Sequence, residues 1–275
     1  MERIFDESFA VYLQEEEKSE HTREKYLRDV QDYLRWSGNA APDKAALLRY
    51  KAELQSRYAP SSVNSKLSAL NVYLDYLGCP ECKVKMLKQQ TQTYCTEKKE
   101  LTRAEYERLV QAAQKKPRLQ LLLQSICATG IRISEHPFLT VEAARQGFAE
   151  VNLKGKYRRV LLPEELCRQL LRYADGCGIT AGSIFVTASG QPLNRSNIWR
   201  EMKNLCTSAG VAPEKVFPHN LRHLFARVYY SSQKDIVRLA DILGHTSVNT
   251  TRIYTRESGQ IHRKQIEELG LIITT

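Results

Sequence analysis

Residues 218–229 have the apolar spacing of an α-helix, and two strongly polar side chains interrupt the stripe. Its apolar members are Leu221, Leu224, Phe225, Val228 and Tyr229. Pro218 suits the first turn of such a helix. His219 and Arg222 stand three residues apart, and a helix places residues i and i+3 on neighbouring parts of one face. The pattern predicts a buried helix that directs both side chains at one place.

The next residues predict two more helical segments. Gly244 is expected to end the first, because glycine most easily takes the left-handed conformation after a helix end. The apolar positions before it are Ile236, Leu239, Ala240 and Leu243. This stop fixes where His245 emerges, and Ser247 can cap a short helix whose far side carries Tyr254.

An upstream segment, Ala128-Thr-Gly-Ile-Arg-Ile-Ser-Glu135, supplies a second arginine after a glycine that breaks or starts a helix. Arginine suits phosphate binding because its planar fork donates two parallel hydrogen bonds and stays charged at any working pH. We therefore place Arg132 beside Arg222 as a candidate phosphate ligand.

Residues 151–163 have the pattern of a β-hairpin with a basic, glycine-containing turn. A lysine on this turn can reach DNA and give a proton to a departing 5′ oxygen. Lys154 and Lys156 flank Gly155, and the position relative to Pro163 favours Lys154, with Lys156 as the alternative.

These residues suit the attack of a phenol on a phosphodiester. A tyrosine hydroxyl has an ordinary pKa of about 10, so presenting it as phenolate at pH 7 costs about 4 kcal/mol. Clustered cations lower that cost, hold the phosphate and neutralise the charge that builds on its oxygens in an in-line transition state.

The chain resembles the tyrosine site-specific recombinases of the phage-integrase or Xer type. Three motifs carry the resemblance: Ala-Thr-Gly-Ile-Arg, His-x-Leu-Arg-His, and Leu-Gly-His followed nine residues on by tyrosine. The order of the candidate residues is that of the family, namely Arg132, Lys154, His219, Arg222, His245 and Tyr254.

The resemblance implies that Tyr254 is the nucleophile of a 3′-phosphotyrosyl intermediate and that Arg132 and Arg222 clamp the phosphate. Lys154 would then be the general acid, and His219 would accept the tyrosine proton or bind a non-bridging oxygen. Because the intermediate keeps the bond energy, rejoining would need no ATP.

In the same family His245 would donate to the phosphate, while Glu135 and His223 would orient the arginines and histidines. The chain departs from the family after Glu135, where it continues His-Pro-Phe-Leu instead of the usual apolar, tryptophan-containing segment. Pro137 is expected to shorten the helix there.

The fold class expected is mainly α with a small β-sheet (α+β). Four stretches of helical periodicity precede residue 80 and predict a four-helix unit, with Ser61 and Ser62 capping the last helix. Residues 83–101 are polar and basic with little periodicity, which indicates an exposed linker. We expect a helical core-binding (SAM-like) domain at 1–88, a linker at 89–100 and a catalytic domain at 101–275.

Composition agrees with a DNA substrate. The formal net charge is +10 and the pI is about 9.2; such an excess favours polyanions but is not diagnostic. Helix N-termini bind phosphate readily, so two predicted helix starts and the hairpin give candidate DNA contacts. These are Thr22, Arg23, Lys25, Tyr26, Ser61, Ser62, Asn64, Lys66 and Lys156.

Seven cysteines without a signal peptide predict reduced thiols in the cytoplasm. Cys79 and Cys82 have the spacing of a metal or redox pair, but no second pair completes a zinc site. Nor does the sequence show the carboxylate cluster that holds magnesium in many nucleases, and no cofactor or membrane contact is expected.

The expected partners are double-stranded DNA with inverted-repeat core sites and other copies of the chain, a dimer on one site and a tetramer in synapsis. In proteins that the chain resembles, the segment after the tyrosine docks into a neighbouring protomer, a role expected of residues 261–273. Two other functions stay open, a DNA-binding protein without catalysis and a type IB topoisomerase that relaxes supercoils.

Overall fold

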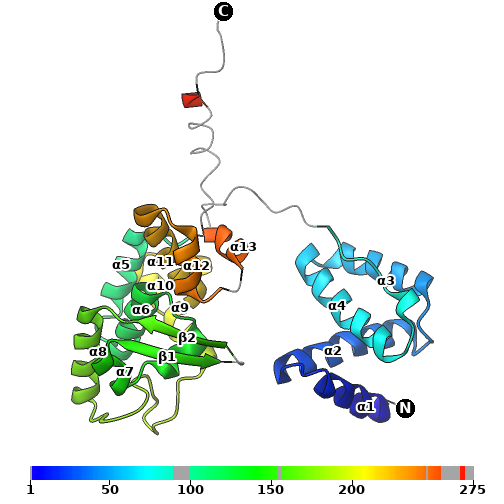
Figure 1. Ribbon diagram of the computed structural model, residues 1–275, viewed down its shortest axis with the longest axis horizontal. Helices are drawn as coiled ribbons and strands as arrows, with labels where there is room; N and C mark the ends of the chain where they lie inside the picture. The colour runs from blue at the N-terminus through cyan, green and yellow to red at the C-terminus, as the bar shows by residue number, and fades with distance from the viewer. Residues whose placement is uncertain (1, 89–99, 154–155, 246, 255–266, 270–275) are drawn as a thin grey trace, which may run out of the picture. The chain divides into compact units, whose positions relative to one another are not determined.

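The computed structural model describes residues 2–88, 100–153, 156–245, 247–254 and 267–269. The chain forms two compact units, Met1–Thr91 and Gln92–Thr275 (Figure 1). Each unit has its own hydrophobic core. The described residues are mostly helical with one two-stranded sheet, which confirms the predicted fold class.

The first unit contains the four predicted helices. They are α1 (Glu2–Glu15), α2 (Glu20–Ser37), α3 (Lys44–Arg57) and α4 (Pro60–Tyr76), followed by the 3-10 turn η1 (Pro80–Cys82). Their apolar stripes meet in a core that includes Phe9, Tyr33 and Leu67. The prediction that Ser61 and Ser62 cap α4 is wrong, because Ala59 is the N-cap and Pro60 occupies the first turn.

Residues 83–88 belong to this first unit and are not part of an exposed linker. Val84 is buried, and its backbone N–H and carbonyl bond to the side-chain amide of Asn71 at 3.1 and 3.0 Å. The Asn64 amide holds the backbone of Leu87 in the same way, at 2.7 and 3.0 Å. A polar sequence hides this packing because two asparagines replace the hydrogen bonds of a regular element. Of the linker expected at 89–100, only Glu100 lies within the described residues.

The second unit contains a helical core and the hairpin. Its elements are α5 (Arg103–Ala112), α6 (Pro117–Thr129), η3 (Ile133–Phe138), α7 (Val141–Gln146), β1 (Phe148–Leu153), β2 (Lys156–Leu161), α8 (Glu164–Gly176), α9 (Arg195–Lys203), α10 (Cys206–Ala209), η4 (Pro213–Lys215), α11 (Pro218–Gln233), α12 (Ile236–Leu243), α13 (Val248–Thr251) and η5 (Arg252–Tyr254). Helices α6 and α11 pack against each other at its centre through Leu122, Ile126 and Leu221, among others.

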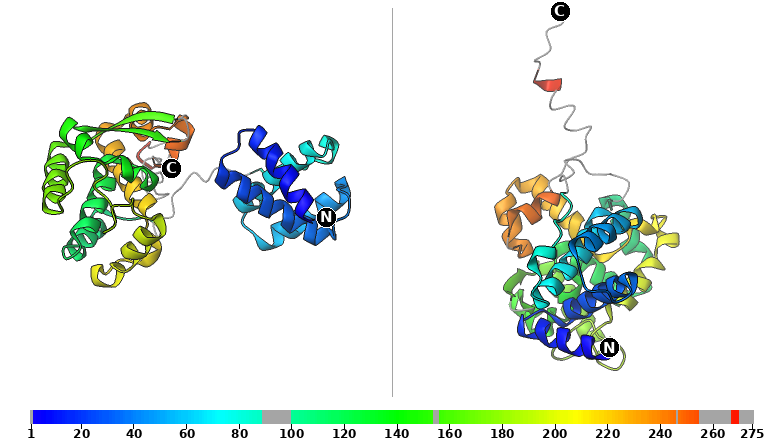
Figure 2. Two further views of the ribbon diagram at one scale, coloured as in Figure 1. Left: turned by 90° about the horizontal axis from the view of Figure 1, so that it is seen from below. Right: turned by 90° about the vertical axis from the view of Figure 1, so that its right-hand side faces the viewer.

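The hairpin pairs β1 and β2 antiparallel, with Val151 opposite Arg158. Alternate positions of β2 face inward, so Val160 is buried while Tyr157 and Leu161 are exposed. In Figures 1 and 2 the orange helices α12 and α13 lie beside this hairpin, and a hydrogen bond from Arg158 to the carbonyl oxygen of Ile242 joins β2 to α12. The hairpin and the C-terminal helices thereby frame one side of the second unit.

Candidate active site

Helix α11 begins at Pro218, as predicted, and it buries Arg222 almost completely, with 2% of the residue exposed. The Arg222 guanidinium donates to the carbonyl oxygens of Gly130 and Leu243, the latter at 2.7 Å from Nη2. Nη2 also lies 3.0 Å from Nε2 of His245. Burial lowers the pKa of Arg222 to about 10, and the positive charge of Arg132 acts in the same direction. The group therefore stays charged at neutral pH, with one helix end on either side of it.

Gly130 ends α6 in the left-handed conformation, with φ at +64°, and the chain then turns to present Arg132. A Cβ atom at Gly130 would lie 2.5 Å from Cδ1 of Phe225, so the close approach of α11 also requires glycine. Arg132 precedes the 3-10 helix η3, which contains Pro137, consistent with the expected shortening. Its side chain is 38% exposed and its Nη2 donates to Gly244 O at 3.2 Å.

Glu135 is a buried carboxylate, 3% exposed, that joins two arginines. Oε1 accepts from Nη1 of Arg132 at 2.9 Å, and Oε2 accepts from the Arg132 backbone N–H at 2.8 Å and from Nη2 of Arg158 at 2.6 Å. Burial raises the pKa of Glu135, but the hydrogen bonds from Arg158 and Arg132 outweigh this and the net pKa is lowered. Sequence reasoning missed Arg158; the alternation of inward and outward residues along β2 was the available signal.

His245 follows the left-handed Gly244, which has φ at +63° and ends α12 as predicted. Burial lowers the pKa of His245 to about 4, helped by the positive charges of Arg222 and Arg132, so the ring is neutral at pH 7. An arginine N–H can only donate, so Nε2 accepts from Arg222. Nδ1 therefore carries the proton and donates to Oγ1 of the buried Thr251 at 2.8 Å.

Tyr254 lies in the 3-10 turn η5 and is 3% exposed. As predicted, Ser247 caps the short helix α13 that leads to it, accepting from Asn249 N–H at 3.3 Å. The Tyr254 side chain interacts with Arg222 and raises the pKa of that guanidinium, and the tyrosine ring stacks on that of His245 with centres 5.8 Å apart.

Two more histidines of α11 surround the same tyrosine. The His223 ring meets Tyr254 edge-on at 4.4 Å between centres, and His219 meets His223 edge-on at 4.3 Å. Burial lowers the pKa of His223 to about 3, and burial with the charges of Arg222, Arg132 and Arg195 lowers the pKa of His219. Nε2 of His223 is buried and has no hydrogen-bond partner among the described residues. The site thus combines charged arginines with neutral imidazoles.

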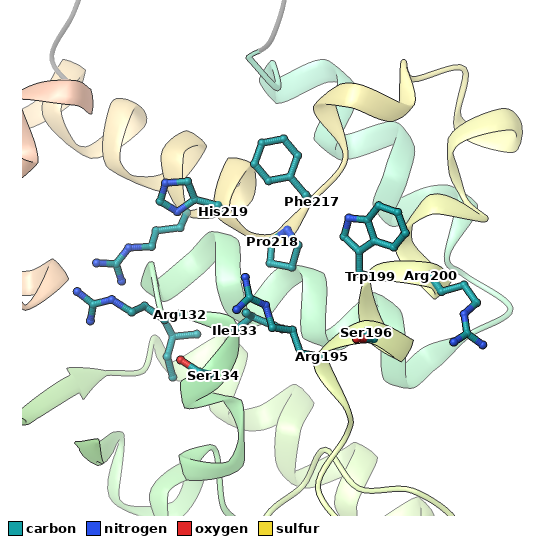
Figure 3. A pocket seen from close by; sticks show the side chains of 12 residues that line it. Arg132, Ile133, Ser134, Arg195, Ser196, Trp199, Arg200, Phe217, Pro218 and His219 are labelled. Atoms are coloured by element: carbon teal, nitrogen blue, oxygen red, sulfur yellow. The ribbon is translucent and has the colours of Figure 1, made fainter. Parts of the chain in front are cut away.

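A cavity of about 870 Å³ opens beside the arginines. Arg132, His219 and Arg222 line it together with Arg195, Trp199 and Arg200, residues that sequence reasoning did not select. In Figure 3, Arg195 lies between Arg132 and Trp199. Arg195 begins α9 and Trp199 is 49% exposed. Only their mixture of basic and aromatic types near the His219 motif offered a sequence signal.

The hairpin lysines are placed less fully. Lys154 lies outside the described residues, and Lys156 begins β2 with a side chain that the structure does not describe. The antiparallel pairing of Leu153 with Lys156 leaves two residues, Lys154 and Gly155, between the strands. The predicted hairpin is therefore confirmed, and the choice between the two lysines stays a prediction.

The candidate DNA contacts in the first unit fall into two groups. Ser61 and Ser62 are exposed in the first turn of α4, and Arg23 makes one surface hydrogen bond to Gln14. Thr22 bonds to Ser19 at 2.8 Å next to the start of α2. Their accessible positions leave the predicted contacts open to test.

The other candidates make contacts inside the unit. Lys25 and Lys66 both bond to Asp29, at 2.6 and 3.0 Å, and Lys66 also bonds to Asp32 at 2.9 Å. The Tyr26 hydroxyl lies 3.2 Å from Ser68 Oγ, and Asn64 holds residue 87 as described above. A DNA contact by any of these side chains would compete with its internal partner.

Within the described ranges, no group of three or more His, Cys, Asp or Glu is arranged to hold a metal ion. Among the same residues, no helix combines the length and apolar character needed to cross a membrane.

Comparison with known proteins places the chain. The phage integrase family model matches residues 99–260, and the model of the phage integrase N-terminal SAM-like domain matches residues 7–78. Tyrosine recombinase XerA of Pyrococcus furiosus is 30% identical over 97% of this chain and 94% of its own length. Tyrosine recombinase XerD of Xanthomonas campestris pv. campestris is 30% identical over 93% of this chain and 86% of its own.

Solved structures agree on the fold. The crystal structure of XerA recombinase covers 98% of this chain and 99% of its own, with 26% identity and a TM-score of 0.54. A lambda integrase dimer bound to a core site covers 90% and 93%, with 17% identity and a TM-score of 0.72. XerH bound to its difH substrate covers 90% and 77%, with 22% identity and a TM-score of 0.67. The chain belongs to the phage integrase family and is a tyrosine recombinase, an enzyme of site-specific DNA recombination.

Proposed function

We propose that this chain cuts and rejoins duplex DNA through a covalent bond between Tyr254 and a 3′ phosphate. The observation that carries the proposal is the charge around the buried tyrosine: among the described residues, the side chains of Arg132, Arg158 and Arg222 gather around one carboxylate, that of Glu135. Buried charge that is not balanced within the protein is costly, and a DNA phosphate in the adjoining cavity supplies the missing negative charge.

Phosphate binding is divided between two arginines. Arg132, which is partly exposed at the cavity, offers its guanidinium directly to the phosphate oxygens. Arg222 is buried at the base of the cavity, where it adds positive charge and interacts with Tyr254. The same guanidinium thereby brings the nucleophile and the phosphate together, the arrangement that in-line transfer requires.

In the cleavage step, the Tyr254 oxygen bonds to phosphorus as the bond to the 5′ oxygen breaks. His219 is neutral near pH 7 because its pKa is lowered, so it can accept the tyrosine proton; its alternative role is to bind a non-bridging oxygen. The departing 5′ oxygen takes a proton from Lys154, with Lys156 as the alternative donor. A 5′ hydroxyl attacks the phosphotyrosine in the reverse step, so rejoining consumes no cofactor.

His245 must change its bonding when DNA arrives. In the free protein Nε2 accepts from Arg222, and an acceptor nitrogen cannot donate to a phosphate. The negative charge of the phosphate opposes the arginine charges that lower the pKa of His245, which favours protonation of Nε2. The protonated ring then donates to the phosphate while Nδ1 keeps its bond to Thr251.

DNA recognition would extend over both units. Beside the cavity, Arg195 and Arg200 suit phosphate contacts, and the exposed ring of Trp199 suits stacking or sugar contacts. Arg23, Ser61 and Ser62 would add contacts from the first unit. The excess of positive charge, +10 overall, favours association with DNA and predicts weaker binding at higher salt.

Assembly is proposed to follow the pattern of the structural neighbours, which include a lambda integrase tetramer bound to a Holliday junction. A dimer of this chain would occupy one inverted-repeat site and a tetramer would join two sites in the cytoplasm of a bacterium, where a phage or mobile element can also encode such an enzyme. Residues 261–273, which lie largely outside the described residues, would dock into a neighbouring protomer. Deleting residues 260–275 should spare half-site binding and abolish cooperative assembly.

The test uses duplexes selected from a random pool by binding to the protein, then nicked so that cleavage releases a short fragment and traps the intermediate. Wild-type protein should form a covalent adduct, and Tyr254→Phe should form none while binding the same duplex. An adduct that survives this substitution contradicts the assignment of Tyr254. Binding without any wild-type adduct would indicate a non-catalytic DNA-binding protein, and relaxation of supercoils without exchange between two sites would indicate a topoisomerase.

A further inference from the structure

Two adjacent arginines of β2 have opposite surroundings. Side chains alternate between the faces of a strand, and the Arg158 side chain is 11% exposed whereas that of Arg159 is 62% exposed. Arg159 pairs with Glu150 at 3.1 Å on the surface and lies over the ring of Phe148. Arg158 faces the interior of the second unit. Substitution of the exposed Arg159 therefore provides a matched control for substitution of Arg158.

Arg158 connects two segments that are distant in the sequence. Its Nη2 donates to Oε2 of Glu135 at 2.6 Å, and its Nη1 donates to the carbonyl oxygen of Ile242 at 2.7 Å. A guanidinium is planar and rigid, so these two bonds fix the separation of their acceptors. The aliphatic part of Arg158 lies against Gly244, where a Cβ atom would come within 2.4 Å of Cδ.

The groups that Arg158 contacts are the groups that hold Arg132. Glu135 accepts from Nη1 of Arg132 at 2.9 Å, and the carbonyl oxygen of Gly244 accepts from Nη2 at 3.2 Å. The Arg132 guanidinium thus lies between two supports, and Arg158 touches both of them. The same turn of α12 leads into His245, so Arg158 also bears on where that imidazole stands.

Charge strengthens this geometric link. Glu135 divides one negative charge between two arginines, which leaves Arg132 only partly neutralised and able to attract a phosphate. Without Arg158, the carboxylate would face Arg132 alone and compete with DNA for it. The Arg158 guanidinium donates to two protein acceptors, and Arg158 does not line the cavity with Arg132.

We propose that Arg158 is a positioning residue for the cleavage step, which holds Glu135 and the end of α12 at the separation that aims Arg132 and His245 at one phosphate. This inference rests on the proposed function of Tyr254. The hairpin would then have two roles: it carries the general acid, and it holds the phosphate-binding side chain of Arg132 in place.

The experiment compares Arg158→Met and Arg158→Lys with Arg159→Met in single-turnover cleavage. Three substrates differ only at the cut bond: an ordinary phosphate, a 5′-bridging phosphorothiolate and a methylphosphonate. Sulfur leaves without a general acid, and a methylphosphonate lacks the negative charge that the arginines neutralise. A defect that the phosphorothiolate rescues therefore lies in the hairpin lysine. A defect that shrinks with the methylphosphonate lies in the arginines that bind the phosphate.

Arg158→Met should slow cleavage of the ordinary phosphate about 100-fold, the size expected when one oriented electrostatic contact is lost. The cleavage rate of Arg158→Lys should lie between those of wild type and Arg158→Met, because an ammonium group cannot bond to both acceptors as a guanidinium does. Arg159→Met should cleave like wild type. The defect of Arg158→Met should persist with the phosphorothiolate and shrink with the methylphosphonate.

Three results would overturn the inference: wild-type cleavage by Arg158→Met, an equal loss in Arg159→Met, or full rescue by the phosphorothiolate, which would place the effect on the lysine. If Arg158→Met fails to fold, Arg158→Lys and the double variant Glu135→Gln/Arg158→Met replace it, since the double variant leaves no unpaired buried charge. In the Glu135→Gln background, Arg158→Met should reduce the cleavage rate by a clearly smaller factor than in wild type. An equal reduction would contradict the proposal that Arg158 acts through Glu135.

Failure of the proposed function is separable from failure of this inference. If wild type forms no adduct, the function of Tyr254 is contradicted, and the geometry is then tested with inorganic phosphate by titration calorimetry. Arg158→Met should bind phosphate about tenfold more weakly than Arg159→Met, as expected for a misplaced charged hydrogen bond. Equal affinities would overturn the role of Arg158.

Discussion

The two units bury their charges in different ways. In the first, Asp29 and Asp32 bond to Lys25 and Lys66, two carboxylates with two ammonium groups, and Asp32 also pairs with Arg35, whose side chain is 68% exposed. In the second, the side chains of Arg132, Arg158 and Arg222 gather around Glu135 and neutral histidines. One cluster is complete within its unit, and the other retains positive charge.

The comparison separates a structural ion cluster from a binding site. A buried charge without a partner is costly, so a protein that keeps unbalanced arginines beside a cavity bears that cost unless a ligand removes it. Basic residues alone do not distinguish the two cases, since both units are rich in them. The balance of positive and negative charge around the basic residues distinguishes the two cases, and in the second unit it indicates a binding site for an anion.

Replacement of Arg222 by alanine should have the largest effect on function. It removes the guanidinium that contacts Tyr254, His245 and the ends of two helices. We expect the single-turnover cleavage rate to fall about 1,000-fold, because a preorganised cation is lost from the transition state. The fluorescence of Trp36 should show an unchanged first unit. A rate within about tenfold of wild type would contradict the role given to this arginine.

Replacement of Lys66 by methionine should reduce the stability of the first unit and leave the cleavage rate unchanged. The Lys66 side chain is 15% exposed and bonds to both carboxylates, so its loss leaves buried negative charge unpaired. The free energy of unfolding of the first unit should fall by roughly 2–3 kcal/mol. This free energy is measured by urea unfolding, followed by the fluorescence of Trp36 in a Trp199→Phe background. Cleavage by the bound complex should stay at the wild-type rate; a large loss of chemistry with intact stability would place Lys66 in the DNA interface instead.

Acid should weaken the second unit selectively, with a smaller effect. Burial lowers the pKa of His245 to about 4 and of His223 to about 3, below the unfolded value of about 6.5. The unfolded chain therefore binds protons more tightly, so this stability is present above about pH 6.5 and is lost as pH falls toward the folded values. The urea midpoint reported by Trp199 in a Trp36→Phe background should drop between about pH 7 and pH 5.5, before carboxylates titrate.

The first unit is the control for this titration, since its single histidine, His21, is exposed. The Trp36 midpoint should change little over the same range. Equal shifts in both units would show that the buried histidines do not carry the effect.

Local patterns allowed the hairpin and the helices around the candidate site in the second unit to be predicted, whereas α5 and α7–α10 were not predicted. Helical spacing brought His219 and Arg222 to one face of α11, and the left-handed Gly244 set the end of α12. These features depend on residues within a few turns of each other, so the sequence displays them directly. The four helices of the first unit were predictable for the same reason.

Contacts between distant segments were not predictable. Arg158 looks in the sequence like any basic residue of a turn, and only its meeting with Glu135 and Ile242 gives it a purpose. Lys66 suggested a DNA contact at a helix start, yet its partners lie on α2, more than thirty positions away in the chain. Local spacing can indicate which face such a side chain takes, but it does not identify the partner.

Mass spectrometry of the trapped adduct tests the central claim most directly. Protein cleaved on a nicked duplex is digested with nuclease and protease, and the modified residue is located by fragmentation. The account predicts a 3′-linked nucleotide on the oxygen of Tyr254. A nucleotide on any other residue, such as the neighbouring Tyr229 or Tyr230 of α11, would contradict it.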